Sequence, residues 1–181
     1  IDYASDKGQI TFYKDMNLGT FISTTEDPQY LTNTGDVNKL IRDSQVFIES
    51  FLGKDKQYDI QYIEGDASNL TLEFHQVYEN ESIYFNTIKL RFNESGLVEA
   101  SVRDFDLDGF IGDVKVLKPV DEVLYKFVDQ MKEQGMTSII IKSIRIGYEL
   151  GPEATDSVDG TVEAIPYYII RLADGDIYYI D

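Results

Sequence analysis

Two segments of the chain place apolar residues three and four positions apart, which is the period of an amphipathic helix. The first is DVNKLIRDSQVFIESFLG, residues 36–53, where Thr34 or Asp36 can cap the start and Gly53 follows the last apolar pair. The second is PVDEVLYKFVDQMKEQG, residues 119–135, which opens on a proline and closes on a glycine. The pattern predicts one amphipathic helix in each segment.

After each predicted helix the apolar period changes to two, which is typical of strands with one buried face. The order of predicted elements is helix, strands and hairpin, and it occurs twice. This order predicts an α+β fold of two helix-plus-antiparallel-sheet units, mostly β with two main helices. The predicted strands are 9–16, 58–63, 69–79, 82–92, 97–105, 136–150, 162–172 and 177–181. We expect an N-terminal strand and linker over 1–33, a first unit over 34–110 and a second unit over 111–181.

The two predicted hairpins differ in the face that is opposite the expected core face. In the first, Ile88, Leu90 and Phe92 alternate with polar residues, and the return strand matches them with Val98, Ala100 and Val102. This hairpin is expected to have one buried face and one hydrated face. In the last hairpin, YYIIRLADGDIYYI, apolar and aromatic residues occupy both faces.

A two-residue turn at Asp174-Gly175 predicts the pairing of the last hairpin. The expected pairs are Leu172 with Ile177, Arg171 with Tyr178, Ile170 with Tyr179 and Ile169 with Ile180. The core face would then carry Ile170, Leu172, Ile177 and Tyr179. The opposite face would carry Tyr167, Ile169, Arg171, Tyr178 and Ile180.

This second face has two interpretations. It packs inside the molecule against the other unit or the N-terminal strand, or it binds a partner, since tyrosine and arginine are enriched at binding hot spots. For the second interpretation the expected contact residues are Tyr167, Ile169, Arg171 and Tyr178. The final strand could also accept a partner strand at its edge.

Composition and charge narrow the function classes. The net charge of −17 argues against a nucleic-acid partner, and the absence of cysteine excludes disulfides and thiolate chemistry. His75 is the sole histidine and has no ordered nucleophile set around it in the sequence. We therefore expect no catalysis and no cofactor.

One acidic stretch, DFDLDGFIGDVK, resembles a calcium loop. Asp104, Asp106, Asp108 and Gly109 occupy loop positions 1, 3, 5 and 6. Lys115 stands at position 12, where a bidentate glutamate belongs, so the stretch is either a metal site at Asp104, Asp106 and Asp108 or a solvated acidic turn.

The end of the chain, VEAIPYYIIRLADGDIYYID preceded by GYELG and an acidic spacer, resembles the C-terminal end of the bacterial YycI regulatory proteins. The helix-then-strands units also look like PepSY-type modules. The YycI resemblance implies a non-enzymatic accessory protein of the WalK (YycG) sensor histidine kinase that also contacts its sister protein YycH. It further implies an extracytoplasmic location, at the membrane, with an N-terminal transmembrane helix outside this sequence.

Two other functions fit the same pattern. A PepSY-like inhibitor or chaperone of a secreted protease would use the last hairpin to fill a groove. A small-ligand or cell-wall-binding domain would use a pocket between helix and sheet.

Overall fold

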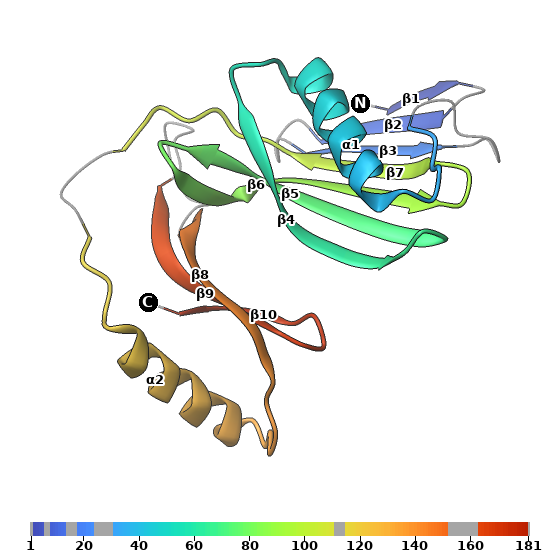
Figure 1. Ribbon diagram of the computed structural model, residues 1–181. Coiled ribbons are helices and arrows are strands. Elements are labelled where there is room, and N and C mark those ends of the chain that lie inside the picture. Colours follow the sequence, from blue (N-terminus) through green and yellow to red (C-terminus); the bar gives the residue numbers. More distant parts are fainter. Residues whose placement is uncertain are drawn as a thin grey trace. The chain divides into compact units, whose positions relative to one another are not determined.

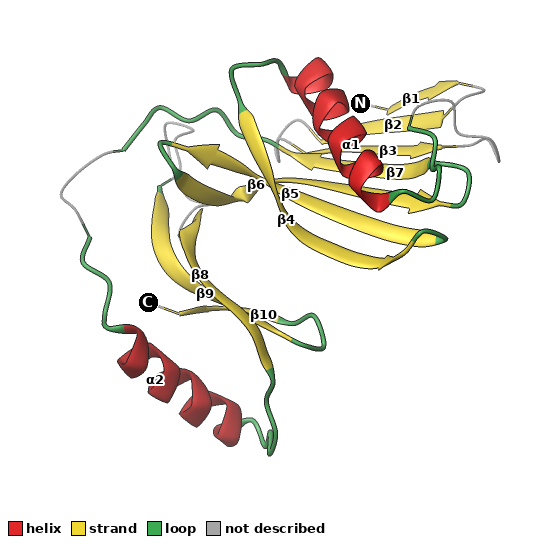
Figure 2. Ribbon diagram, viewed as in Figure 1, coloured by secondary structure: helices red, strands yellow, loops and turns green. Residues whose placement is uncertain are grey.

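Both segments with helical periodicity form helices. Helix α1 spans Val37–Leu52, and Asp36 caps it by accepting a hydrogen bond from the Lys39 amide at 3.1 Å. Helix α2 spans Val120–Glu133 and begins directly after Pro119. Gly135 has a φ of +82°, and its amide donates to the Lys132 carbonyl at 2.9 Å, which closes the last turn of α2. Figure 2 shows the two helices among the strands.

The computed structural model describes the backbone of residues 2–5, 8–13, 18–23, 31–110, 115–151 and 163–180, and side chains from residue 31 onward within these ranges. The chain divides into two units, Ile1–Leu107 and Asp108–Asp181 (Figure 1). We call these unit 1 and unit 2. The division falls three residues before the predicted one at 110/111. Residues 24–30 of the expected N-terminal linker lie outside the described residues.

The described strands of unit 1 form an antiparallel sheet in the order β1-β2-β3-β7-β6-β5-β4. Before α1, the sequence predicts a single strand over 9–16, whereas three strands form and β3 pairs with β7. These N-terminal strands therefore extend the sheet of unit 1. The strands of unit 1 are β1 Asp2–Ser5, β2 Gly8–Tyr13, β3 Leu18–Ser23, β4 Gln57–Asp66, β5 Asn69–Tyr78, β6 Glu81–Asn93 and β7 Leu97–Arg103.

The core of unit 1 lies between α1 and one face of this sheet. From the helix, Leu40 and Ile48 are buried, and Val37, Ile41, Phe47 and Leu52 pack against the same cluster. Phe51, which the apolar stripe of the helix also includes, is 54% exposed. The strands contribute Tyr58, Leu70, Leu72, Phe74, Ile88, Leu90, Phe92, Leu97 and Ala100. Alternate residues of β5 and β6 therefore supply most of the buried surface, as the period of two predicts.

The first hairpin contains a bulge that changes one core residue. Ile88 pairs with Val102 and Leu90 with Ala100, as the alternation predicts. Phe92, however, pairs with Leu97, because the register shifts between Arg91 and Phe92. Leu97 is fully buried and Val98 is not. The expectation that Val98 belongs to the core was therefore wrong by one position.

Unit 2 is a three-stranded antiparallel sheet, among its described residues, with α2 on one face. Its strands are β8 Ile141–Leu150, β9 Ala164–Leu172 and β10 Ile177–Ile180, with β9 in the middle. The first five residues of the predicted strand 136–150 precede β8. From the helix, Val123, Phe127 and Met131 are buried, and they pack on Tyr168, Ile170, Leu172 and Ile180. The prediction of an α+β fold built from two helix-plus-antiparallel-sheet units is confirmed.

The last hairpin forms where the sequence places it, but with a different register. Ile177 pairs with Arg171, Tyr178 with Ile170, Tyr179 with Ile169 and Ile180 with Tyr168. The Leu172 amide donates to the Asp176 carbonyl at 2.9 Å, and the Gly175 amide donates to the Leu172 carbonyl at 3.2 Å. With Gly175 at a φ of +101°, this is a three-residue loop with a glycine bulge, not the predicted two-residue turn.

The extra loop residue moves every side chain of β10 to the other face of the sheet. Tyr178 and Ile180 point toward α2, and Ile177 and Tyr179 point away from it. The predicted faces of β9 are correct, because Ile170 and Leu172 belong to the core. The predicted faces of β10 are wrong, because a one-residue slip reverses a pattern of period two.

Candidate functional site

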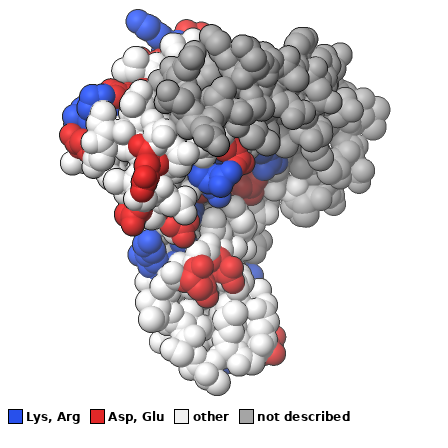
Figure 3. Space-filling view, turned by 90° about the vertical axis from the view of Figure 1, so that its right-hand side faces the viewer, with Lys and Arg blue, Asp and Glu red and all other residues white. Residues whose placement is uncertain are grey.

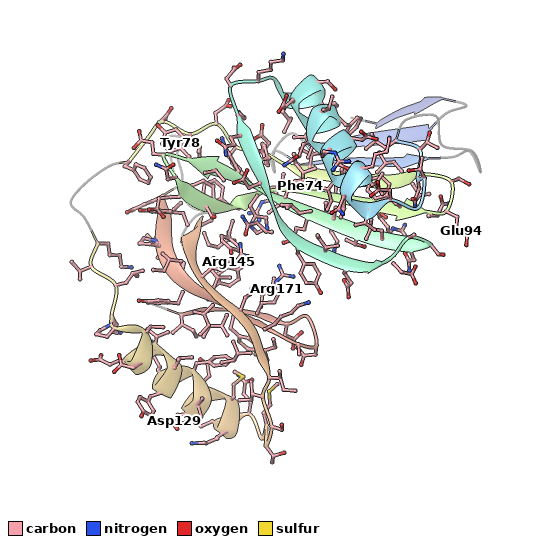
Figure 4. All side chains as sticks on the ribbon, viewed as in Figure 1. Phe74, Tyr78, Glu94, Asp129, Arg145 and Arg171 are labelled. Carbon is pink, nitrogen blue, oxygen red and sulfur yellow. The ribbon has the colours of Figure 1, made fainter. Side chains whose placement is uncertain are left out.

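The face of the unit 2 sheet that points away from α2 combines arginine with aromatic residues. Figure 4 shows Arg145 from β8 and Arg171 from β9 on this side of the sheet, while Asp129 marks α2 on the other side. We call this surface the arginine face. Its residues are Arg145, Tyr167, Ile169, Arg171, Ile177 and Tyr179.

Strand register sets the neighbours on the arginine face. Ile169 lies between Arg145 and Tyr179, which are its cross-strand partners. In the next row Arg171 lies between Ser143 and Ile177. The Tyr167 and Tyr179 rings meet edge to face, with centroids 6.1 Å apart. Arg145 is exposed and Tyr179 keeps 41% of its surface exposed, so the face presents both charge and aromatic surface to solvent.

The structure groups three of the four predicted contact residues on this face. Tyr167 and Arg171 lie together there, half-buried. Ile169 shares the face but is only 3% exposed, so its side chain has little surface left for a partner. Whether any of them contacts a partner stays a prediction.

Tyr178 does not belong to this face. Its ring packs on Phe127 of α2, with centroids 5.2 Å apart, so the placement of Tyr178 beside Arg171 was wrong. Ile177 takes the position opposite Arg171 that was assigned to Tyr178, and Tyr179 lies on the same face opposite Ile169. Sequence reasoning also left Arg145 out, although its position in the alternating pattern of β8 was visible.

The aspartates of the predicted calcium loop face a lysine. The Lys56 ammonium lies 2.7 Å from an Asp104 carboxylate oxygen and 3.1 Å from one of Asp106. The Tyr58 hydroxyl donates to the other Asp104 oxygen at 2.8 Å. A cation and a phenol therefore occupy the oxygens that a metal would need, and Asp104 is part of an internal ion pair.

Beyond Asp106, the described residues of that loop add no ligand set. Asp108 is exposed, and loop positions 8 to 11, residues 111–114, lie outside the described residues. Over the ranges that the structure describes, no three His, Cys, Asp or Glu side chains gather closely enough to hold a metal ion. The geometry thus gives Asp104 a structural role and offers the calcium hypothesis no support.

The ion pair shifts two pKa values upward. Burial raises the pKa of the Tyr58 hydroxyl well above its usual range, and the hydrogen bond to Asp104 raises it further. Burial alone would lower the pKa of Lys56, but its hydrogen bonds to Asp104 and Asp106 and their charges outweigh this and raise it. Both groups therefore stay protonated in the fold at a pH where the unfolded chain releases their protons.

We expect unit 1 to lose stability in alkaline solution. Because the folded state holds protons that the unfolded state releases, each of the two groups lowers the free energy of unfolding by up to about 1.4 kcal/mol per pH unit above about pH 10. The substitution Tyr58→Phe should make this decline shallower. Urea denaturation at pH values from about 8 to about 11 measures it, and Tyr125→Phe, at an exposed position on α2, is the control. Identical slopes for Tyr58→Phe and the unsubstituted chain would contradict the assignment.

A buried asparagine holds the chain where it leaves β7. The Asn86 side chain donates to the Phe105 carbonyl at 2.9 Å and accepts from the Phe105 amide at 2.8 Å. It also donates to Gln76 Oε1 at 2.6 Å. Asn86 lies in a stretch of β6 that bulges, because β5 pairs His75 with Thr87 and then Gln76 with Ile83. The bulge turns the polar Asn86 side chain inward. Its carboxamide then makes the two hydrogen bonds to the backbone of Phe105 that a neighbouring strand would otherwise make.

His75 lies beside the same bulge and is buried. Its Nε2 is 2.7 Å from a Glu73 carboxylate oxygen, and the Tyr84 ring meets it edge to face at 4.3 Å. Only 2% of the His75 side chain is exposed. Such burial fits a structural role for His75, because a general base must reach its substrate.

Charges of both signs are mixed on the molecular face that Figure 3 displays. Figure 3 shows acidic and basic side chains interspersed with uncharged surface over the described residues. Neither described helix has the length and apolar character that crossing a bilayer requires.

Comparison with known proteins leaves the family open. No family model matches this sequence, and no curated protein matches it either. Among solved structures, the chain is similar to the YpeB C-terminal domain of Bacillus megaterium. The identity is 12%, the TM-score is 0.45, and the alignment covers 100% of this chain and 88% of that one. A likeness this distant carries no argument about what the chain does, and membership of the YycI family stays a prediction.

Proposed function

We propose that this chain is a non-enzymatic extracytoplasmic regulatory protein. In this proposal it binds a membrane sensor histidine kinase of the WalK type and a YycH-like sister protein, and it modulates two-component signalling in cell-wall homeostasis. The resemblance of residues 162–181 to YycI proteins names these partners. The observation that carries the proposal is the arginine face, where Arg145 and Tyr179 remain accessible on a sheet whose other side is buried under α2.

The chemistry of this face suits protein recognition. Arginine and tyrosine dominate measured hot spots, because each combines a large apolar contact area with directional hydrogen bonds. The face also lies on three paired strands, so its side chains need little ordering when a partner binds. Regulation would then follow from unequal affinity for two kinase states, since equal affinity shifts no equilibrium.

We expect substitutions on the arginine face to weaken partner binding. Arg171→Glu and Tyr179→Ala should each raise the Kd for the kinase ectodomain or the sister protein by at least about tenfold, a loss of about 1.4 kcal/mol or more. Co-purification from membranes, followed by titration of purified domains, measures the change. Tyr125→Ala is the matched control, because Tyr125 is 75% exposed on α2, on the other side of the sheet.

Each outcome of this experiment decides one point. Unchanged binding by both face variants, with circular dichroism like that of the unsubstituted chain, would remove the arginine face as the contact surface. Failure of the unsubstituted chain to bind either partner would remove the proposed function itself. Inhibition of secreted proteases by the purified chain would favour the inhibitor function instead.

A further inference from the structure

We infer that Asp108 is a site of spontaneous covalent modification, at which the Asp108-Gly109 peptide bond rearranges to an isoaspartyl bond. Asp-Gly pairs are open to this reaction because glycine has no Cβ, so the preceding carboxyl group reaches its backbone nitrogen without hindrance. Two such pairs lie in the described residues, Asp108-Gly109 and Asp174-Gly175, and a third, Asp159-Gly160, lies outside them. The inference goes beyond the proposed function and does not depend on it.

The rearrangement needs no reactant other than water. The Gly109 backbone nitrogen attacks the side-chain carboxyl carbon of Asp108, and the acid hydroxyl leaves as water together with the amide proton. Water then adds to one of the two carbonyl carbons of the cyclic imide, and the C–N bond at that carbon breaks. Opening at the side-chain carbonyl restores aspartate, whereas opening at the main-chain carbonyl leaves isoaspartate. No atom is gained or lost overall.

The loop that follows β7 is held at both of its ends. Residues 104–110 have no regular secondary structure (Figure 2). Near the start, Asn86 bonds to the Phe105 amide at 2.8 Å and to the Phe105 carbonyl at 2.9 Å. At the end, the Phe110 ring contacts Tyr148 of β8, with centroids 5.3 Å apart. The loop therefore has a fixed point in each unit, on either side of the Asp-Gly pair.

Asp108 and Gly109 lie between these two fixed points, and both are exposed. Within the described part of the chain, neither residue takes part in a hydrogen bond, an ion pair or a ring contact. The Gly109 nitrogen can therefore turn toward the Asp108 carboxyl group without first breaking a bond of the fold.

The second Asp-Gly pair has the same chemistry but is held in place by its loop. Asp174 is exposed as well, so access to solvent does not distinguish the two sites. The Gly175 amide donates to the Leu172 carbonyl at 3.2 Å, and the Asp174 carboxylate accepts from the Asp176 amide at 3.1 Å. Both hydrogen bonds must break before the imide can form, which should slow the reaction at Asp174 by at least about fivefold.

Isoaspartate changes the connection between unit 1 and unit 2. The main chain then runs through the side-chain methylene of residue 108, which adds one backbone atom, and the former main-chain carboxyl becomes a charged side group. Because unit 2 begins at Asp108, the extra atom falls at the boundary of the two units and outside both hydrophobic cores. We therefore expect both units to stay folded after the modification.

The test incubates the full chain in mildly acidic buffer made with water enriched in heavy oxygen, below the temperature at which the chain unfolds. Trypsin cleaves after Arg103, Lys115 and Arg171, which puts the two pairs into separate peptides, residues 104–115 and 172–181. Each passage through the imide adds one heavy oxygen, and electron-transfer fragmentation distinguishes isoaspartate from aspartate. We expect both signals to accumulate at residue 108 at least about fivefold faster than at residue 174.

Two controls separate the effect of the fold from the chemistry of the pair. The same incubation in urea removes the fold and runs until both peptides show product, and the two rates should then agree within about twofold. The variant Asp108→Glu should give no product in the peptide 104–115, because the longer side chain would have to close a larger ring. Circular dichroism checks that this variant folds like the unsubstituted chain.

Three results would overturn the inference. The first is an equal or faster rate at residue 174 in the folded chain. The second is an absence of product at residue 108 in the folded chain over the period in which the chain in urea forms it, which would mean that the fold protects this site too. The third is heavy oxygen in the peptide 104–115 of Asp108→Glu at the rate of the unsubstituted chain, which would place the reaction at another residue.

Discussion

The substitution Phe127→Ala is expected to remove about 3–5 kcal/mol from the free energy of unfolding of unit 2. The Phe127 side chain is fully buried, lies between Val123 and Met131 on the inner face of α2, and contacts the Tyr178 ring. The described part of unit 2 has one helix and one sheet, so few other groups can fill the cavity. Since small domains are stable by only about 5–15 kcal/mol, a loss of this size removes much of the stability of unit 2.

Hydrogen exchange locates the effect of Phe127→Ala. Amides of β9 should lose protection most, because Tyr168, Ile170 and Leu172 of this strand form the other half of the same core. Tyr125→Ala, two positions away on the exposed side of α2, should change the free energy of unfolding by less than about 0.5 kcal/mol. A loss below about 1 kcal/mol for Phe127→Ala would mean that α2 does not cover this sheet as described.

The substitution Asn86→Ala is expected to cost unit 1 about 3 kcal/mol. The Asn86 carboxamide takes part in three hydrogen bonds, to Gln76 and to both backbone groups of Phe105, and it is fully buried. Removing it leaves buried donors and acceptors without partners, and each such group costs about 1–3 kcal/mol. Chemical denaturation followed by a probe in unit 1 measures the change.

Ser44 is the matched comparison for Asn86. It is also fully buried, on α1, but its Oγ has no hydrogen-bond partner within the described part of the chain. The substitution Ser44→Ala should therefore leave stability unchanged or raise it slightly, because no bond is lost and alanine favours the helix. If Asn86→Ala and Ser44→Ala had equal effects, burial alone and not the hydrogen bonds of Asn86 would govern the site.

Periodicity predicted the helices and most strands of this chain because those elements bury one face each. The helices are indicated by the spacing of apolar residues around Leu40 and Phe127. The strands are indicated by the alternation of Leu70, Leu72 and Phe74. The caps at Asp36 and Gly135 also follow from local chemistry. Where the periodicity of a residue's own segment determines whether its side chain is buried, the sequence therefore predicts that burial.

The misses occur where a single residue changes the register. The bulge opposite Arg91 moved the core position from Val98 to Leu97, and the loop at Gly175 moved Tyr178 into the core. An Asp-Gly pair is compatible with both a two-residue and a three-residue loop, and the choice depends on packing against α2. The arginine face was therefore assigned correctly on β9 but incorrectly on β10.

The polar cluster around Asn86 could not be predicted from local pattern. Ile83, Tyr84, Phe85 and Asn86 are all buried in succession, which neither a period of two nor one of 3.6 produces. The bonds of Asn86 run to residue 105, and those of Lys56 to Asp104, so they join segments far apart in the sequence. The spacing of Asp104, Asp106 and Asp108 matched a calcium loop, but only the fold shows that a lysine reaches two of these residues.

The length of the loop between β9 and β10 determines which tyrosine side chain lies on the arginine face. Loops on protein surfaces usually tolerate gain or loss of a residue, because the flanking strands keep their alignment. Here the loop at Gly175 decides whether Tyr178 or Tyr179 lies on the same face of the sheet as Arg171. Among homologous chains, a deletion as small as Ala173 would exchange the inner and outer tyrosines without altering any residue of either strand. Loop length alone would thus change the chemical character of this face while both strand sequences stay the same.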